Sequence, residues 1–137
     1  YPKLFPQPGY HVLAKDHLLA GKYLLFKWKR IKLRLERGII MIARLTFIRI
    51  KPDDFEEAVR IYENSVVPEA KLQKGFCGGY LFNDTASGKG IALTLWTCLE
   101  DLVASENNLY YQNQLIKFLD KFVMPPIKEE YNVLLQY

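Results

Sequence analysis

The two residues best placed to do chemistry are Arg44, in a mainly apolar segment, and Trp96, at the end of another. A charge among apolar residues needs a partner. For Arg44 that partner is either a carboxylate, such as Glu129 or Glu130, or a substrate anion; an ion pair within the protein is favoured. Trp96 either packs in the core, where it covers Gly79, or forms an aromatic pocket wall on which a planar substrate stacks. The packing role is favoured.

A polar and aromatic cluster at residues 107–113 supplies further candidates. Part of it forms a solvated face, but Tyr110, Tyr111 or Asn113 would donate hydrogen bonds to a bound molecule if they face a pocket. A tyrosine can act as a general acid or orient an enolate, although its ordinary pKa of about 10 makes it a poor base. We therefore predict Trp96 and Arg44 as catalytic residues. The predicted substrate-binding residues are Trp96, Tyr110, Tyr111 and Asn113.

Several other kinds of site are not supported. Both histidines, His11 and His17, lie in the first 40 residues, so the rest of the chain lacks the commonest general base and metal ligand. Gly88-Lys89-Gly90 lacks the glycine spacing and following helix of a phosphate loop. The acidic residues of the first predicted helix of the domain fall on its outer face. We expect no metal site.

These candidates are organised around a predicted hairpin, with strands over 75–82 and 91–98 and a polar turn between them. A turn centred between Ser87 and Gly88 pairs Trp96 with Gly79 and Cys77 with Cys98. A cross-strand disulfide is one option for the cysteines, and two buried free thiols are the favoured one. One face of the hairpin then carries Phe76, Tyr80, Phe82, Ile91, Leu93 and Leu95, and the other carries Leu81, Thr94, Trp96 and both cysteines. Both faces are apolar, so both must be covered.

The elements around the hairpin complete a recognisable order. Residues 41–51 are rich in β-formers, and Pro52 ends this strand. A helix capped by Asp53 or Asp54 follows, with Phe55, Ala58, Val59, Tyr62 and Val66 on its apolar side, and Pro68 should end or kink it. A short helix over 99–105 precedes a second one capped by Asn107 or Asn108, with an apolar stripe of Leu109, Ile116, Leu119, Phe122 and Val123. Residues 127–137 form the last strand.

The order β-α-β-β-α-β predicts an α+β fold, a ferredoxin-like antiparallel sheet with helices on one face. The other sheet face needs a partner, and a second copy of the chain is the simplest one. Which hairpin face meets the helices stays open.

The first 40 residues differ from the rest in charge. They carry nine Lys or Arg against two acids, a net charge of +7, whereas residues 41–137 carry ten against 13, a net charge of −3. Residues 18–35 alternate apolar and basic types with one slip, so strand, helix and bulge are all open. Glu36-Arg37-Gly38 can be encoded by a purine-rich run like a ribosome-binding site, two codons before Met41. Residues 1–40 are therefore either translated upstream sequence or a basic arm that binds a membrane or nucleic acid. Residues 41–137 form the domain.

Four segments carry a family resemblance: Met41–Leu45, Lys74–Tyr80, Gly88–Trp96 and Met124–Tyr131. They resemble the antibiotic biosynthesis monooxygenase superfamily, whose members are dimeric α+β barrels in which two ferredoxin-like sheets pack face to face. The resemblance implies a cofactor-independent monooxygenase acting on a small aromatic or hydrophobic substrate. It equally admits a non-catalytic dimeric small-molecule-binding or stress-associated protein of the same fold.

The sequence departs from the catalytic patterns of that superfamily. The polyketide oxygenases carry an Asn four residues before the tryptophan, where this chain has Ala92. The haem-degrading members carry a Trp and a His on the following helix, and residues 99–123 contain neither. We expect a cytoplasmic homodimer that uses no cofactor and binds no nucleic acid. We also expect that it does not bind a membrane, unless residues 18–37 are a genuine arm.

Overall fold

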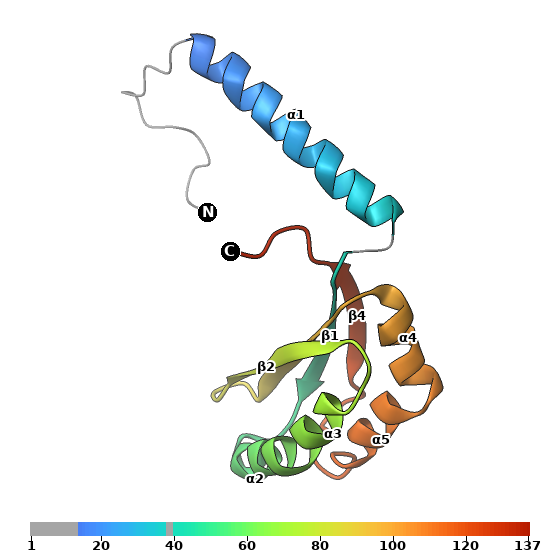
Figure 1. The fold of residues 1–137 in the computed structure, drawn as a ribbon. Helices are drawn as coiled ribbons and strands as arrows, with labels where there is room; N and C mark the ends of the chain where they lie inside the picture. Colours follow the sequence, from blue (N-terminus) through green and yellow to red (C-terminus); the bar gives the residue numbers. More distant parts are fainter. Residues whose placement is uncertain (1–13, 38–39) are drawn as a thin grey trace. The chain divides into compact units, whose positions relative to one another are not determined.

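A computed structural model describes residues 14–37 and 40–137 of the chain (Figure 1). The chain divides into two compact units, Tyr1–Glu36 and Arg37–Tyr137. Two of the residues on which the hypothesis of translated upstream sequence rests, Gly38 and Ile39, lie outside the described residues.

The basic segment is helical. Helix α1 spans Ala14–Glu36. Of the three conformations left open by the sequence pattern of residues 18–35, the helix is therefore the one observed. Among its large apolar side chains, Leu24, Phe26 and Trp28 are more than half exposed. Within the described ranges, no helix combines the length and the apolar character that crossing a bilayer requires.

The domain contains one four-stranded sheet in the order β2-β3-β1-β4. Its strands are β1 (Ile42–Arg49), β2 (Phe76–Asp84), β3 (Lys89–Trp96) and β4 (Ile127–Asn132). Every neighbouring pair is antiparallel. The helices pack on one side of this sheet (Figure 1). The ferredoxin-like prediction is confirmed.

The helical layer contains six short pieces. They are the 3-10 turn η1 (Pro52–Asp54), α2 (Phe55–Ile61), the π-helical turn η2 (Tyr62–Val66), α3 (Val67–Lys71), α4 (Leu99–Asn107) and α5 (Tyr110–Ile116). Pro68 does not end the first of these helices, because the helical backbone continues to Lys71. The π-helical turn changes the hydrogen-bond spacing just before Pro68, which then lies in the first turn of α3, where a proline needs no N–H.

The hairpin register differs by two residues from the predicted one. Tyr80 pairs with Leu93, and Asp84 pairs with Lys89. The turn is centred one residue earlier because the Asp84 side chain organises it. Its carboxylate accepts hydrogen bonds from the Ala86 N–H at 3.1 Å and the Ser87 hydroxyl at 2.6 Å. Since a shift of two residues preserves the strand faces, most of the predicted face assignment survives.

A bulge between Phe76 and Gly78 changes the start of β2. Gly78 has a φ of 134°, a conformation that L side chains rarely adopt. Phe76 therefore lies opposite Trp96 and packs against it edge-on, 5.7 Å between ring centres, rather than sharing a face with Tyr80.

Neither cysteine lies where the sequence placed it. Cys77 is exposed beside the bulge, and Cys98 precedes helix α4, where its thiol donates to Asp101 at 3.4 Å. Both thiols are free, and they do not form a pair of buried residues across the hairpin.

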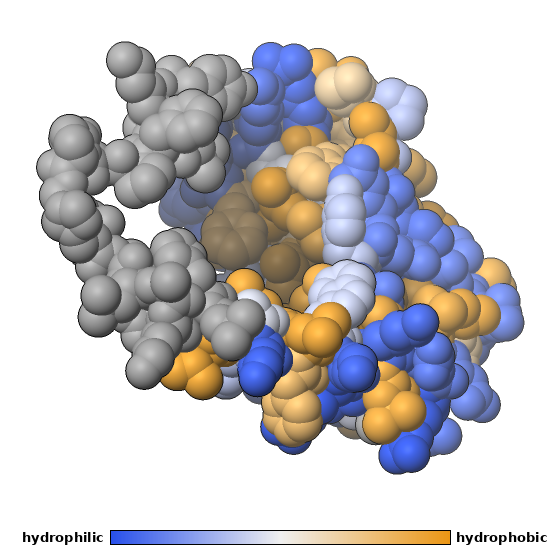
Figure 2. Space-filling model, turned by 90° about the horizontal axis from the view of Figure 1, so that it is seen from above, coloured by the Kyte–Doolittle hydropathy of each residue, from blue (hydrophilic) through white to orange (hydrophobic). Residues whose placement is uncertain are grey.

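The predicted apolar stripe on the second helix is also wrong. Four of its five members, Leu109, Ile116, Leu119 and Val123, are exposed. Leu109 is left-handed, with φ 67°, and α5 begins only after it, so Tyr110 and Gln114 face the interior instead. Hydrophobic side chains stand exposed among hydrophilic ones on the surface seen in Figure 2. The N-cap residue of α5 is Leu109 rather than the predicted Asn107 or Asn108, although the Asn108 side-chain oxygen accepts from the Tyr110 N–H at 2.9 Å.

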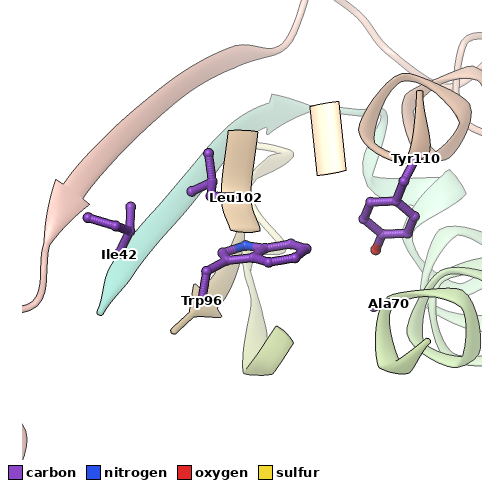
Figure 3. Close-up of a cluster of buried hydrophobic side chains, with 5 residues drawn as sticks. All are labelled: Ile42, Ala70, Trp96, Leu102 and Tyr110. Carbon is purple, nitrogen blue, oxygen red and sulfur yellow. The ribbon is translucent and has the colours of Figure 1, made fainter. Parts of the chain in front are cut away.

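One of two buried hydrophobic clusters is centred on Trp96, which is 0% exposed, and the other contains Ile50, Phe55 and Ala58. Its indole lies between Leu102 and Tyr110, with Ile42 and Ala70 completing the cluster (Figure 3). The indole N–H donates to the Thr94 hydroxyl at 3.0 Å, so its one polar atom is satisfied internally.

Candidate functional site

A cavity of about 80 Å³ lies between the sheet and the helices. The side of the sheet that meets the helices carries Arg44 and Thr46 of β1, Leu81 of β2, and Ala92 and Thr94 of β3. The helical layer supplies the opposite wall. Besides the polar Gln114, the rest of the cavity lining is apolar or aromatic: Ile48, Ile50, Phe55, Ala58, Val59, Tyr62, Val66, Tyr110, Tyr111, Leu115, Phe118 and Phe122.

Arg44 supplies the only cationic group among these lining residues. Its side chain is 2% exposed, and Nη1 donates to the Ser105 hydroxyl at 3.1 Å. The same nitrogen lies 3.5 Å from Glu106 Oε1. Lys128 lies nearer to that oxygen, at 2.7 Å. Glu106 is therefore shared between two cations, and it neutralises Arg44 only in part. The predicted partners Glu129 and Glu130 are wrong: Arg44 reaches α4 instead.

Arg44 has further donors that make no hydrogen bond to the described residues. A guanidinium has five N–H groups on three nitrogens, and the hydrogen bonds of Arg44 to described residues all use Nη1. Burial lowers the pKa of Arg44, opposed by Tyr111 and Glu106, but an arginine stays protonated in proteins. The cavity therefore contains a permanent positive charge with unused donors.

Aromatic rings hold the guanidinium in place. Its central carbon lies 4.2 Å from the Tyr111 ring centre and 5.1 Å from the Trp96 ring centre. Tyr111 is itself fixed by a hydrogen bond of 3.0 Å between its hydroxyl and that of Thr46. These contacts preorganise Arg44 before any ligand binds.

Two tyrosines in the cavity are neutral donors at ordinary pH. Burial raises the pKa of Tyr110 to about 12, and it raises the pKa of Tyr62 despite the opposing effect of Arg44. Neither phenol acts as a base near neutral pH, because each holds its proton more tightly than a free tyrosine. Both can donate a hydrogen bond to an anionic oxygen.

The structure brings together only part of the predicted site. Arg44, Tyr110 and Tyr111 line the cavity. Trp96 does not, since it lies behind them in the core, and it faces Phe76 rather than Gly79. Asn113 is exposed and does not line the cavity either.

The sequence interpretation missed Thr46, Tyr62 and Gln114 as site residues. For Tyr62 the sequence did contain a signal, because this residue places a hydroxyl group in an otherwise apolar helical stripe. Gln114 donates to Glu69 at 2.7 Å and to the Tyr110 carbonyl at 3.2 Å. Its amide therefore positions the helices more than it offers a free group.

Across residues 14–37 and 40–137, no group of His, Cys, Asp and Glu side chains is arranged to hold a metal ion. The cavity wall likewise presents no carboxylate or imidazole. Its chemistry is that of a cation, three phenols and apolar surface.

Solved structures with the same architecture identify the fold. A proposed antibiotic biosynthesis monooxygenase from Caulobacter crescentus superimposes with a TM-score of 0.59 at 13% identity, covering 70% of this chain and 92% of the other. A protein of unknown function from Nitrosomonas europaea gives a TM-score of 0.58 at 16% identity, over 73% and 95% of the two chains. The domain has the antibiotic biosynthesis monooxygenase fold.

A third neighbour with this monooxygenase fold is a variant of SnoaB, a cofactor-independent oxygenase from Streptomyces nogalater. Its TM-score is 0.56 at 10% identity, over 70% of this chain and 95% of that one. No family model and no curated protein matches the sequence. Ala92, where the resemblance leads one to look for an asparagine, does line the cavity, so that position carries a methyl group in place of an amide.

Proposed function

We propose that the domain binds a small, weakly acidic aromatic or enolic compound and oxidises it as a cofactor-independent monooxygenase. The observation that carries the proposal is the buried Arg44 guanidinium, which is only partly neutralised by Glu106 and has donors to spare in an aromatic-lined cavity. A cation at that position favours the ionised form of a phenol or enol.

The chemistry follows from stabilising that anion. A phenolate is electron-rich and reduces dioxygen directly. A phenol with a free para position becomes a quinone: one oxygen atom enters the ring as a carbonyl, the other leaves as water, and the substrate supplies all four electrons. Arg44 stabilises the oxyanion, while Tyr62 and Tyr110 offer neutral donors.

Oxygen uptake tests this function. Hydroxylated benzenes and naphthalenes are incubated with the protein in an oxygen electrode, and the products are weighed by mass spectrometry after use of labelled dioxygen. One labelled oxygen atom per product is expected, with a rate about a hundredfold lower in Arg44→Met. Equal rates with and without protein would overturn the oxygenase assignment.

A second function is binding without reaction. The specific observation in its favour is that the cavity lining contains no carboxylate or imidazole to remove a substrate proton. Under this alternative the same compounds bind through Arg44, but oxygen uptake stays at the uncatalysed rate.

The sheet face away from the helices supports a homodimer. Its residues are largely apolar, and Tyr80, Phe82, Ile127 and Tyr131 on it are about half exposed or more. A second copy of the same sheet would cover them, which is the arrangement that the resemblance leads us to expect.

A further inference from the structure

A second hollow adjoins the cavity. It is a groove of about 450 Å³ between edge strand β2 and the helical run α2–η2–α3. Its residues include Val67 and Lys71 on the helical side and Gly78, Gly79 and Tyr80 on the strand.

The groove lies directly beside the cavity. They share five lining residues, which form the boundary between the two spaces: Val59, Tyr62, Val66, Leu81 and Thr94. A molecule with one end beside Arg44 would enter the groove by passing these five side chains.

Their sizes assign different parts of a ligand to the two spaces. An apolar cavity that holds benzene has a volume of about 150 Å³, so the inner cavity of about 80 Å³ takes an oxygen substituent and the edge of a ring. The groove follows the helical run from Val59 to Lys71, which is about 18 Å at the helical rise. A groove that spreads a volume of about 450 Å³ over that length is long and narrow.

Two glycines keep the groove open. Gly79 lies on the helix-facing side of β2, opposite Thr94. A Cβ on Gly79 would collide with the Leu93 carbonyl oxygen, and Gly78 has a φ of 134°. The backbone of β2 thus excludes side chains at the point where the groove passes it, so the strand leaves room that a ligand can fill.

The charges on the groove indicate a neutral occupant. Glu63 and Lys71, its only charged lining residues, have opposite signs, and both are exposed. The remaining helical wall is apolar, with Val59, Val66, Val67 and Ala70.

We propose that the groove binds an unbranched alkyl chain attached to the aromatic head that Arg44 recognises. The substrate class is then an alkylphenol or alkylresorcinol rather than a compact fused-ring compound. The inference rests on the proposed function, because it takes the head group from it and adds the tail.

Calorimetric titration of the full chain with resorcinol, ethylresorcinol and hexylresorcinol tests the assignment. Each methylene that enters an apolar groove tightens binding by about fourfold, so hexylresorcinol should bind on the order of a hundredfold more tightly than ethylresorcinol. Val67 lines the groove and not the inner cavity, so Val67→Trp should remove most of this gain and weaken the binding of ethylresorcinol much less than that of hexylresorcinol.

Leu72→Trp is the matched control, since Leu72 is 83% exposed and lines neither space. It should bind hexylresorcinol as the unsubstituted protein does, and circular dichroism melting should show both variants folded. Equal affinity for the two alkylresorcinols, or equal loss in both tryptophan variants, would overturn the groove assignment and leave the proposed function standing. If none of the three compounds binds, the proposed function fails together with the inference.

Discussion

Arg44 and Tyr111 form the central contact of the cavity wall: the guanidinium carbon lies 4.2 Å from the centre of the phenol ring. The Tyr111 hydroxyl is hydrogen-bonded to Thr46, the next residue but one on the same strand as Arg44. The strand therefore fixes both partners, and the charge points into the cavity at a defined place. The effects of this arrangement on stability and on ligand binding can be measured separately.

Removing the carboxylate should cost more stability than removing the guanidinium. Glu106→Gln leaves a nearly fully buried Arg44 without its anion, and we expect a loss of about 3 kcal/mol in the free energy of unfolding. Arg44→Met removes the buried charge, and Glu106 keeps Lys128 at 2.7 Å, so about 1 kcal/mol is expected. Urea denaturation of the two variants measures both values, and the reverse order would contradict this account of the ion pair.

Trp96 should matter for folding and not for ligand contact. Trp96→Ala opens a large void in the core cluster and should lower the free energy of unfolding by about 4 kcal/mol. Trp96→Phe retains most of the packing, and its affinity for hydroxylated aromatics should stay within about threefold of the unsubstituted protein. Trp28→Ala, at an exposed position on α1, is the control and should change stability by less than about 0.5 kcal/mol. A selective affinity loss in a stable Trp96→Phe would return Trp96 to the site.

Tyr110 should make the fold sensitive to alkali. Its pKa is raised to about 12 in the folded protein, against about 10 when unfolded. The stabilisation is complete below the unfolded pKa and is lost as pH rises toward the folded one, because the unfolded state ionises first. Between about pH 9 and about pH 11.5 the protein should lose on the order of 2 kcal/mol more stability than Tyr110→Phe. Tyr137→Phe, at the exposed chain end, should follow the unsubstituted protein; a Tyr110→Phe curve that does the same would refute the assignment.

The uncovered sheet face should mediate self-association. Phe82→Asp places a carboxylate among apolar residues of that face and should convert a dimer of twice 16.0 kDa into monomers in light scattering. Leu72→Asp, exposed on the helical side, serves as the control and should leave the dimer intact. A monomer in the unsubstituted protein at micromolar concentration would contradict the proposed dimer.

The order of the elements and the sheet topology could be predicted from sequence because both follow from hydrophobic period and connection rules. The hairpin register could not, because it depends on the hydrogen bonds of Asp84 and on a bulge at Gly78. Both the turn and the bulge depend on local side-chain and backbone conformation, which the hydrophobic pattern of the sequence does not specify.

The site was predictable only in part, for a related reason. Arg44 stood out as a charge in an apolar strand, and Tyr110 and Tyr111 as donors. The true carboxylate partner, Glu106, lies 62 residues away and comes near only when α4 packs on the sheet. The helical period did place Tyr62 on the inner side of its helix, but it did not indicate the π-helical turn in which the residue lies.

The most direct test of the central claim is the pKa of a chromogenic phenol bound in the cavity. Nitrophenol absorbance is titrated against pH with saturating protein and again with Arg44→Met. If Arg44 stabilises the bound anion, the pKa of the bound phenol should fall by about one unit or more relative to water, and the fall should vanish in the variant. A bound pKa that is unchanged or raised in the unsubstituted protein would contradict the claim that this cavity is built to hold an aromatic oxyanion.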